Sequence, residues 1–256
     1  MKLNHFSRLL VLILVFFSCS SEKEIIYLND ISVKNLEISE YKDYLLKVDD
    51  ILKIEISSQI PEASMIFKMN QLNSNVSQSK DAILFDGYQI NTAGYINLPI
   101  LGSLKVLGLS VIDVRNLIHD TIISRGILND PSVDVKLANA HFIILGEVNV
   151  PGRHSYLENN LNILEAIAIA GDLTIFGKRN EIKLIRFDGE NKYIKNIDLT
   201  SKDFLTSENF QINSGDIILV NPNKTRVKNA GIIGNSGTLL SLLSFILSSI
   251  IVINNN

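Results

Sequence analysis

The chain has 256 residues, which is enough for one large domain or two modest ones. Its formal net charge is −3, so the composition offers no electrostatic case for a nucleic-acid-binding protein. Hydrophobic residues make up 46% of the chain, and part of that content is gathered at the two ends.

The amino terminus has the layout of a secretory signal peptide. Lys2 and Arg8 precede an apolar run over residues 9–17, and the small residue Ser18 follows it. Nine apolar residues are too few to span a membrane stably. We therefore predict that residues 1–18 are a signal peptide.

Cys19 is the only cysteine of the chain, so it cannot form an internal disulfide. The segment 15–19, Val-Phe-Phe-Ser-Cys, resembles a bacterial lipobox, which implies cleavage before Cys19 and acylation of its thiol and new amino group. The alternative is an ordinary signal peptide with an incidental cysteine. Ser20 stands where an aspartate would signal inner-membrane retention, so the resemblance favours the outer membrane, with residues 19–40 as a lipidated tether.

The first strand is predicted by strict alternation. Leu52, Ile54 and Ile56 alternate with Lys53 and Glu55, the period-two pattern of a half-buried strand. Further along, residues 88–90 and 95–98 are predicted to form a hairpin through a turn that ends at Gly94, where glycine permits a positive φ.

A helix is predicted next. Ser110 stands three residues before Asp113 as in a capping box, apolar residues follow at helical spacing, and Gly126 is a plausible C-cap. Asp130 and Pro131 then open a strand in which apolar and polar residues alternate over 133–137.

The following block has an α+β pattern. Residues 142–146 form an apolar run typical of a buried strand, and Pro151-Gly152 predicts a type II turn. A helix is expected over 161–170 that ends at Gly171, and its inward face should consist of Leu161, Leu164, Ile167 and Ala168. A hairpin is expected around Asp188-Gly189, and the last strand spans 216–220, before Pro222.

Two turns of the chain are similar to each other. Residues 48–54 resemble residues 214–220, and both launch a strand. Asp49 stands where Gly215 stands in the second turn, and aspartate tolerates left-handed backbone better than most residues. We interpret this similarity as shared turn chemistry rather than as a duplication.

No charged residue follows Lys228, and residues 230–253 are predicted to form a transmembrane helix. About two dozen residues rising 1.5 Å each give roughly 36 Å, enough to cross a bilayer core. A helical projection gathers small and hydroxyl-bearing residues on one side and apolar residues on the other. The first set is Gly234, Gly237, Thr238, Ser241, Ser244 and Ser248.

That two-sided helix has two interpretations. Serines in a solitary helix can hydrogen-bond to its own carbonyls, and small residues mark close helix pairing, which indicates a plain anchor. In a ring of copies, the same residues would line a pore.

Six short motifs follow one another in the order of a known family. They are Asp50-Ile51-Leu52, the segments 94–102, 130–135 and 146–152, Ala170-Gly171, and the segment 215–220. The structural motif positions are Asp50, Gly94, Pro99, Gly102, Pro131, Gly146, Pro151, Gly152, Gly171, Gly215 and Asp216. Together, behind a lipobox, they resemble the Wza-like outer-membrane polysaccharide export lipoproteins over roughly residues 41–222.

The resemblance implies an α+β fold with a small mixed-sheet polysaccharide-export domain at 41–138 and one β-grasp-like SLBB domain at 139–222. It further implies a ring of eight copies whose carboxy-terminal helices form an α-helical barrel through the outer membrane, with the bulk of each copy in the periplasm. The polysaccharide substrate would pass through uncut. The implied partner is an inner-membrane polysaccharide co-polymerase, often with a tyrosine-kinase domain.

Nothing in the sequence predicts an enzyme, a cofactor or a metal. His5 lies in the signal peptide, and His119, His141 and His154 lack metal-ligand spacing. An enzyme that trims the polymer would need convergent acid and base residues, which the pattern does not offer. The stronger alternative to a conduit is a periplasmic glycan-binding or scaffold lipoprotein that its tail merely anchors.

Overall fold

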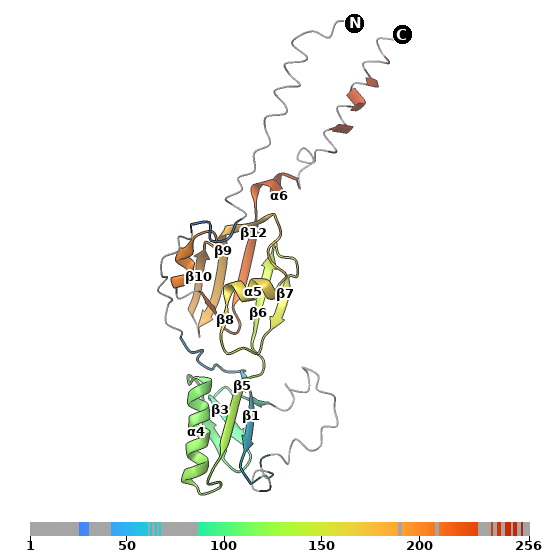
Figure 1. The fold of residues 1–256 in the computed structure, drawn as a ribbon. Helices are drawn as coiled ribbons and strands as arrows, with labels where there is room; N and C mark the ends of the chain where they lie inside the picture. The colour runs from blue at the N-terminus through green and yellow to red at the C-terminus, as the bar shows by residue number, and fades with distance from the viewer. Residues whose placement is uncertain are drawn as a thin grey trace.

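The structure is a computed structural model of the full chain. It describes residues 26–30, 42–60, 62, 65, 67, 87–188, 191–207 and 210–229, and nine positions between 237 and 252. Cys19 and the whole predicted signal peptide lie outside the described residues. Within them, two lobes stack end to end, each around its own hydrophobic core (Figure 1).

The first lobe is built on a three-stranded antiparallel sheet in the order β2-β1-β5. These strands are β1 (Ile51–Ser57), β2 (Tyr88–Gln89) and β5 (Ser132–Leu137). A separate hairpin joins β3 (Tyr95–Leu98) to β4 (Gly102–Lys105), and α4 (Val111–Ser124) packs beside β5. The alternation predicted for β1 is confirmed, since Leu52, Ile54 and Ile56 are buried.

The predicted capping box at the start of α4 is confirmed. The Ser110 hydroxyl accepts a hydrogen bond from the Asp113 amide at 3.1 Å, and the Asp113 carboxylate accepts one from the Ser110 amide at 3.0 Å. Both bonds satisfy N–H groups that a helix start leaves unpaired. The hydrogen bonds from Ser110 lower the pKa of Asp113.

Ser110→Ala should therefore lower the free energy of unfolding by about 1 kcal/mol, the usual effect of losing an N-cap. Ser124→Ala is the matched control at the other end of α4, because its hydroxyl donates only to the Thr121 carbonyl. Urea denaturation of both variants measures the difference. Equal unfolding midpoints would show that the cap does not stabilise α4.

The predicted hairpin between residues 88–90 and 95–98 was wrong. β2 pairs with β1, and β3 pairs with β4. The Asn91 side chain accepts hydrogen bonds from the amides of Ala93 and Tyr95, which turns the chain out of the β2 sheet. The tight turn instead follows Pro99, where Ile100 and Gly102 both have positive φ.

The second lobe holds a five-stranded sheet in the order β10-β9-β12-β6-β7, with β6 and β12 parallel. The strands are β6 (His141–Gly146), β7 (Gly152–Ser155), β9 (Gly177–Asp188), β10 (Asn191–Ile197) and β12 (Ile217–Pro222). Other elements are β8 (Leu161–Asn162), α5 (Ile163–Ile169), the 3₁₀ helix η2 (Lys202–Thr206), β11 (Gln211–Ile212) and α6 (Lys224–Asn229).

The predicted hairpin of β9 and β10 is confirmed by their antiparallel pairing. The helix predicted over 161–170 is shorter, because Asn162 caps it at 3.0 Å from the Glu165 amide and the preceding residues pair with β11. Its inward face was half right: Ile167 is buried, whereas Ala168 is exposed and Leu164 only partly covered.

Residues 26–30 pack on the second lobe, against residues that lie more than 140 positions later in the chain. The Leu28 amide donates to the Leu199 carbonyl at 3.0 Å, and the Tyr27 hydroxyl donates to Asp172 at 2.5 Å. The Tyr27 ring also lies 5.0 Å from the guanidinium of Arg179. The predicted tether therefore contributes packing to the second lobe before the chain enters the first.

The transmembrane helix predicted over residues 230–253, and with it the α-helical barrel, was wrong. Among the residues that the structure describes, no helix combines the length and the apolar character that crossing a membrane requires.

Candidate functional site

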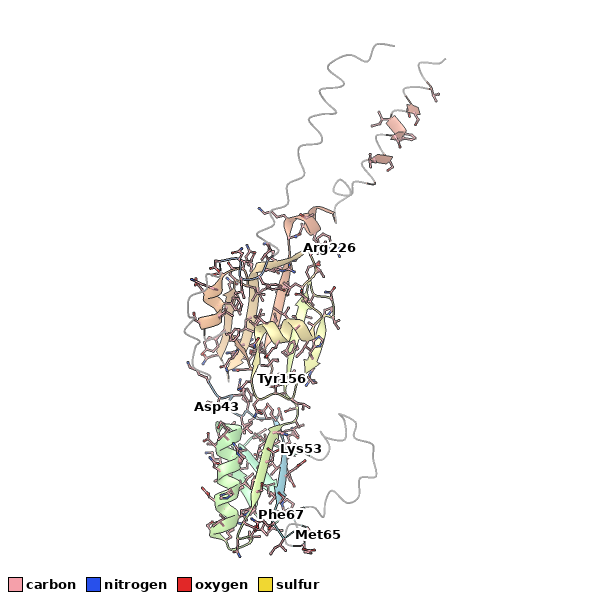
Figure 2. All side chains as sticks on the ribbon, viewed as in Figure 1. Asp43, Lys53, Met65, Phe67, Tyr156 and Arg226 are labelled. Carbon is pink, nitrogen blue, oxygen red and sulfur yellow. The ribbon has the colours of Figure 1, made fainter. Side chains whose placement is uncertain are left out.

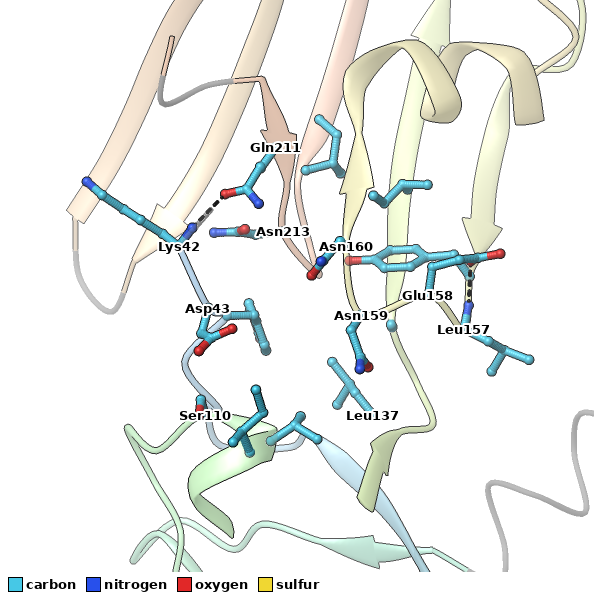
Figure 3. Close-up of a pocket in the computed structure, with 17 residues that line it drawn as sticks. Lys42, Asp43, Ser110, Leu137, Leu157, Glu158, Asn159, Asn160, Gln211 and Asn213 are labelled. Carbon is cyan, nitrogen blue, oxygen red and sulfur yellow. Dashed lines mark hydrogen bonds between the residues drawn. The ribbon is translucent and has the colours of Figure 1, made fainter. Parts of the chain in front are cut away.

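The two lobes meet across a cleft of about 230 Å³, which we call the junction cleft (Figure 3). The connecting segment 42–44 forms one wall, the start of α4 lies below, and β11 with the loop after β7 closes the rest. The lining is rich in amide and aromatic side chains. These are Tyr44, Tyr156, Asn159, Asn160, Gln211 and Asn213.

A second hollow of about 490 Å³, the basic groove, shares the connecting segment with the junction cleft. Its lining includes four cationic side chains and the single carboxylate Asp43. The cations are Lys42, Lys47, Arg186 and Lys195. Asp43 and Tyr156 mark the height of the junction in Figure 2, whereas Arg226 lies at the far end of the second lobe.

Hydrogen bonds hold the connecting segment against the second lobe. The Lys42 amide donates to the Gln211 side-chain oxygen at 3.1 Å, and Lys47 Nζ donates to the Phe187 carbonyl at 2.7 Å. Because Oε1 of Gln211 is the acceptor, its NH₂ group is the donor end of that side chain. The junction is thus fixed from both lobes.

The turn before β1 places Asp50 next to the cleft. Its carboxylate accepts hydrogen bonds from the Tyr44 hydroxyl at 3.1 Å and from the Lys47 amide at 2.8 Å. Burial raises the pKa of Asp50, and these donors act in the opposite direction. Burial also raises the pKa of Tyr44 far above its ordinary value, and the charges of Asp50 and Asp216 add to the rise.

Asp49 adopts a φ of 70° and Gly215 a φ of 87°, which confirms the similarity predicted between the two turns. Asn139 completes the first turn, because its amide donates to the Asp49 carbonyl and accepts from the Ile51 amide. Sequence reasoning missed Asn139, which stands 90 residues from the turn that it supports.

The turn before β12 places Asp216 beneath the basic groove. Its side chain is 1% exposed and accepts three hydrogen bonds from Arg186: Nε donates to both carboxylate oxygens, at 2.9 and 3.2 Å, and NH2 donates to one of them at 2.7 Å. The same guanidinium donates to the Gln211 carbonyl at 2.7 Å. Burial raises the pKa of Asp216, and Arg186 opposes that rise. Sequence reasoning missed Arg186, because β9 also contains Lys178, Arg179 and Lys183 and no pattern singles out one of these cations.

The structural motif positions fall at turns and close approaches. Positive φ is found at Gly94, Gly102, Gly146, Gly152, Gly171 and Gly215. Pro131 is buried at the start of β5, Pro99 follows β3, and Pro151 precedes β7. The structure brings Asp50 into hydrogen-bond contact with Tyr44 and places Asp216 close enough for its charge to act on Tyr44.

The predicted pore-lining residues are described only in part. Gly237, Ser241, Ser244 and Ser248 are helical and exposed, whereas Gly234 and Thr238 lie outside the described residues. The Ser244 hydroxyl donates to the Ser241 carbonyl at 2.9 Å, as serines of a solitary helix do.

Within the described part of the chain, no group of three or more histidine, cysteine or acidic side chains is arranged to hold a metal ion. His154 lies against the Phe142 ring and contacts the Val150 carbonyl, and His141 contacts the Asn139 carbonyl. Both histidines therefore have partners within the second lobe.

Comparison with known proteins places the resemblance mainly in the first lobe. Residues 28–138 match the family model described as polysaccharide biosynthesis/export protein. The EPS I polysaccharide export outer membrane protein EpsA of Ralstonia nicotianae is 30% identical in an alignment 141 residues long, which covers 52% of this chain and 35% of that protein. The protein of the same name from Ralstonia solanacearum is 26% identical over 140 residues, 53% of this chain and 36% of that protein. These alignments thus span about a third of the length of the curated relatives.

Proposed function

We propose that this chain, whose residues 28–138 match the polysaccharide biosynthesis/export family, is a subunit of the apparatus that exports a polysaccharide across the outer membrane. The single observation that carries the proposal is this family match, because it covers the whole of the first lobe. The relatives from both Ralstonia species are named as outer membrane export proteins, which supports the same location for this chain.

The export role needs a conduit or a guide, and we propose a ring of identical copies, eight by resemblance to the family. Acylation of Cys19 would hold each copy at the outer membrane, with the two lobes in the periplasm. The proposed substrate is a capsular or extracellular polysaccharide that passes uncut. The proposed partner on the inner side is a polysaccharide co-polymerase, often with a tyrosine-kinase domain.

The alternative is a lipoprotein that binds glycan or acts as a scaffold without forming a channel. The amide-rich junction cleft favours glycan contact under either candidate, so contact alone does not separate them. The number of copies in the assembly separates the two candidates.

Electron microscopy of the protein after gentle detergent extraction tests the ring. We expect closed ring-shaped particles with a central opening and a mass that is a multiple of the subunit mass. A uniform population of single subunits would contradict the conduit and leave the scaffold role. A Cys19→Ser variant is the control for membrane attachment, because it should leave the outer membrane fraction.

A further inference from the structure

We propose that the basic groove and the junction cleft together form a binding site for an anionic glycan, with the basic groove taking a sugar residue that carries a carboxylate. This inference rests on the proposed function, because it names the chemical class of the exported polymer. It begins from a contrast in charge: the chain carries a formal net charge of −3, yet the groove is lined by four cations and one carboxylate.

The floor of the basic groove is a pair of adjacent strands. In the register of β9 and β10, Arg186 lies opposite Tyr193 and Leu184 lies opposite Lys195. Residues directly opposite in an antiparallel pair share one face of the sheet, so all four side chains face the groove. Lys192, three residues from Lys195, lies on the other face and over the Phe187 ring.

Not all of the groove's positive charge is neutralised within the protein. Arg186 is paired with the buried Asp216, so its main role is to hold the floor rigid. Lys47 Nζ donates to a backbone carbonyl, which fixes the ammonium at the junction without cancelling its charge. Lys195 is exposed on the floor. A carboxylate that enters the groove therefore meets a site positioned for charge-assisted hydrogen bonds.

The rest of the lining suits the remainder of a sugar. Amide side chains donate and accept at the same time, as vicinal hydroxyls require, and Gln211 and Asn213 line both hollows. The Tyr193 ring is 43% exposed on the groove floor and offers an apolar face with a hydroxyl at its edge. Since the two hollows share the segment 42–44, a glycan can continue from the groove into the cleft.

The test is a binding titration of the full chain with a fluorescently labelled tetrasaccharide of galacturonic acid. The matched probe is the same tetrasaccharide after reduction of its carboxyl groups to alcohols, which keeps linkage and length and removes only the charge. We expect the acidic probe to bind and the reduced probe to bind at least about tenfold more weakly, because charge-assisted hydrogen bonds are roughly twice as strong as neutral ones.

Two substitutions place the effect in the groove. Lys195→Gln should weaken binding of the acidic probe about fivefold and leave binding of the reduced probe unchanged. Lys192→Gln changes the net charge of the chain by the same amount, but it lies on the opposite face of β10. It should leave the affinities for the acidic and the reduced probe unchanged. A long-range effect of net charge would weaken binding of the acidic probe by the same factor in both variants.

Failure to bind the acidic probe, equal affinity for both probes, or an equal loss in the two variants would overturn the proposal. These outcomes are separate from the export role. If the wild-type protein restores export in cells but does not bind the acidic probe, the proposed export function stands and the proposed anionic glycan site is wrong.

Discussion

Arg186→Met is expected to lower the free energy of unfolding by about 3 kcal/mol, because it leaves a buried carboxylate without its cation. Asp216 is 1% exposed, and without Arg186 it would keep the hydrogen bond from the Asn213 amide, at 2.8 Å. Methionine keeps most of the apolar stem of arginine, so the loss reports on the charge pair rather than on packing. Urea denaturation at neutral pH measures the change.

The direction in which the stability of Arg186→Met changes with pH shows whether the unpaired Asp216 carboxylate causes the loss. Without Arg186, burial of Asp216 is opposed only by the Asn213 amide and the more distant charge of Lys47, so the folded-state pKa of Asp216 rises further above the unfolded value. The folded state then binds more protons than the unfolded state as the pH falls, so the variant should recover stability on acidification through that pKa. A deficit that stays constant from neutral to acidic pH would contradict an unpaired Asp216 as the cause.

Two variants serve as controls for this pair. Arg226→Met removes the exposed pair with Glu147, whose cation is 56% exposed, and should change stability by less than about 1 kcal/mol. Adding Asp216→Asn to Arg186→Met should restore part of the loss, because the amide carries no charge to bury. Additive losses in the double variant would indicate that the two residues act independently.

Gly146→Ala is expected to destabilise the second lobe by about 4 kcal/mol, near the upper end for a single substitution. A Cβ at this position would lie 2.0 Å from the Val220 carbonyl oxygen, and the backbone has a φ of 96°. That oxygen is the acceptor of the Glu147 amide in the parallel pairing of β6 with β12. The two central strands would have to separate for the methyl group to fit.

Gly102→Ala separates the effect of the steric clash from the effect of the positive φ. Gly102 has a φ of 74°, and a Cβ there would have nothing within 4 Å, so only the backbone strain applies. We expect a loss of about 1–2 kcal/mol from that strain. Thermal unfolding of both variants provides the comparison. Equal losses would show that close approach to Val220 does not govern the effect.

Local turn and cap chemistry was predictable because it depends on residues that are neighbours in the chain. The capping box of Ser110 and Asp113 is one case, and the left-handed Asp49 is another. The family resemblance is confirmed by the match over residues 28–138, which contains the first three of the six motifs. The other three motifs lie beyond that range and stay a prediction.

Pairing partners were not predictable in the same way. β2 and β3 are separated by a short turn, yet each pairs with a different strand, because the Asn91 side chain redirects the chain between them. The parallel contact of β6 with β12 joins residues more than 70 positions apart, and no local pattern encodes that register.

The candidate site was only partly visible in the sequence. Asp50 and Asp216 were identified as turn residues, but Tyr44, Arg186 and Gln211 come from three segments that are far apart in the sequence. Arg186 contacts Gln211 within the second lobe, and Tyr44 lines the same groove from the connecting segment. The apolar composition of residues 230–253 led to the prediction of a transmembrane helix. Among the described residues, no helix is long and apolar enough to cross a membrane. The hydroxyl-bearing face predicted there depended on that span.

The most direct test of the account is to delete the gene in the source cells and measure polysaccharide at the cell surface and inside the cell. We predict that surface polysaccharide is lost while its synthesis continues inside, and that the full-length chain restores it whereas a chain lacking residues 42–137 does not. An unchanged amount of polysaccharide on the surface of the deleted cells would contradict the export role.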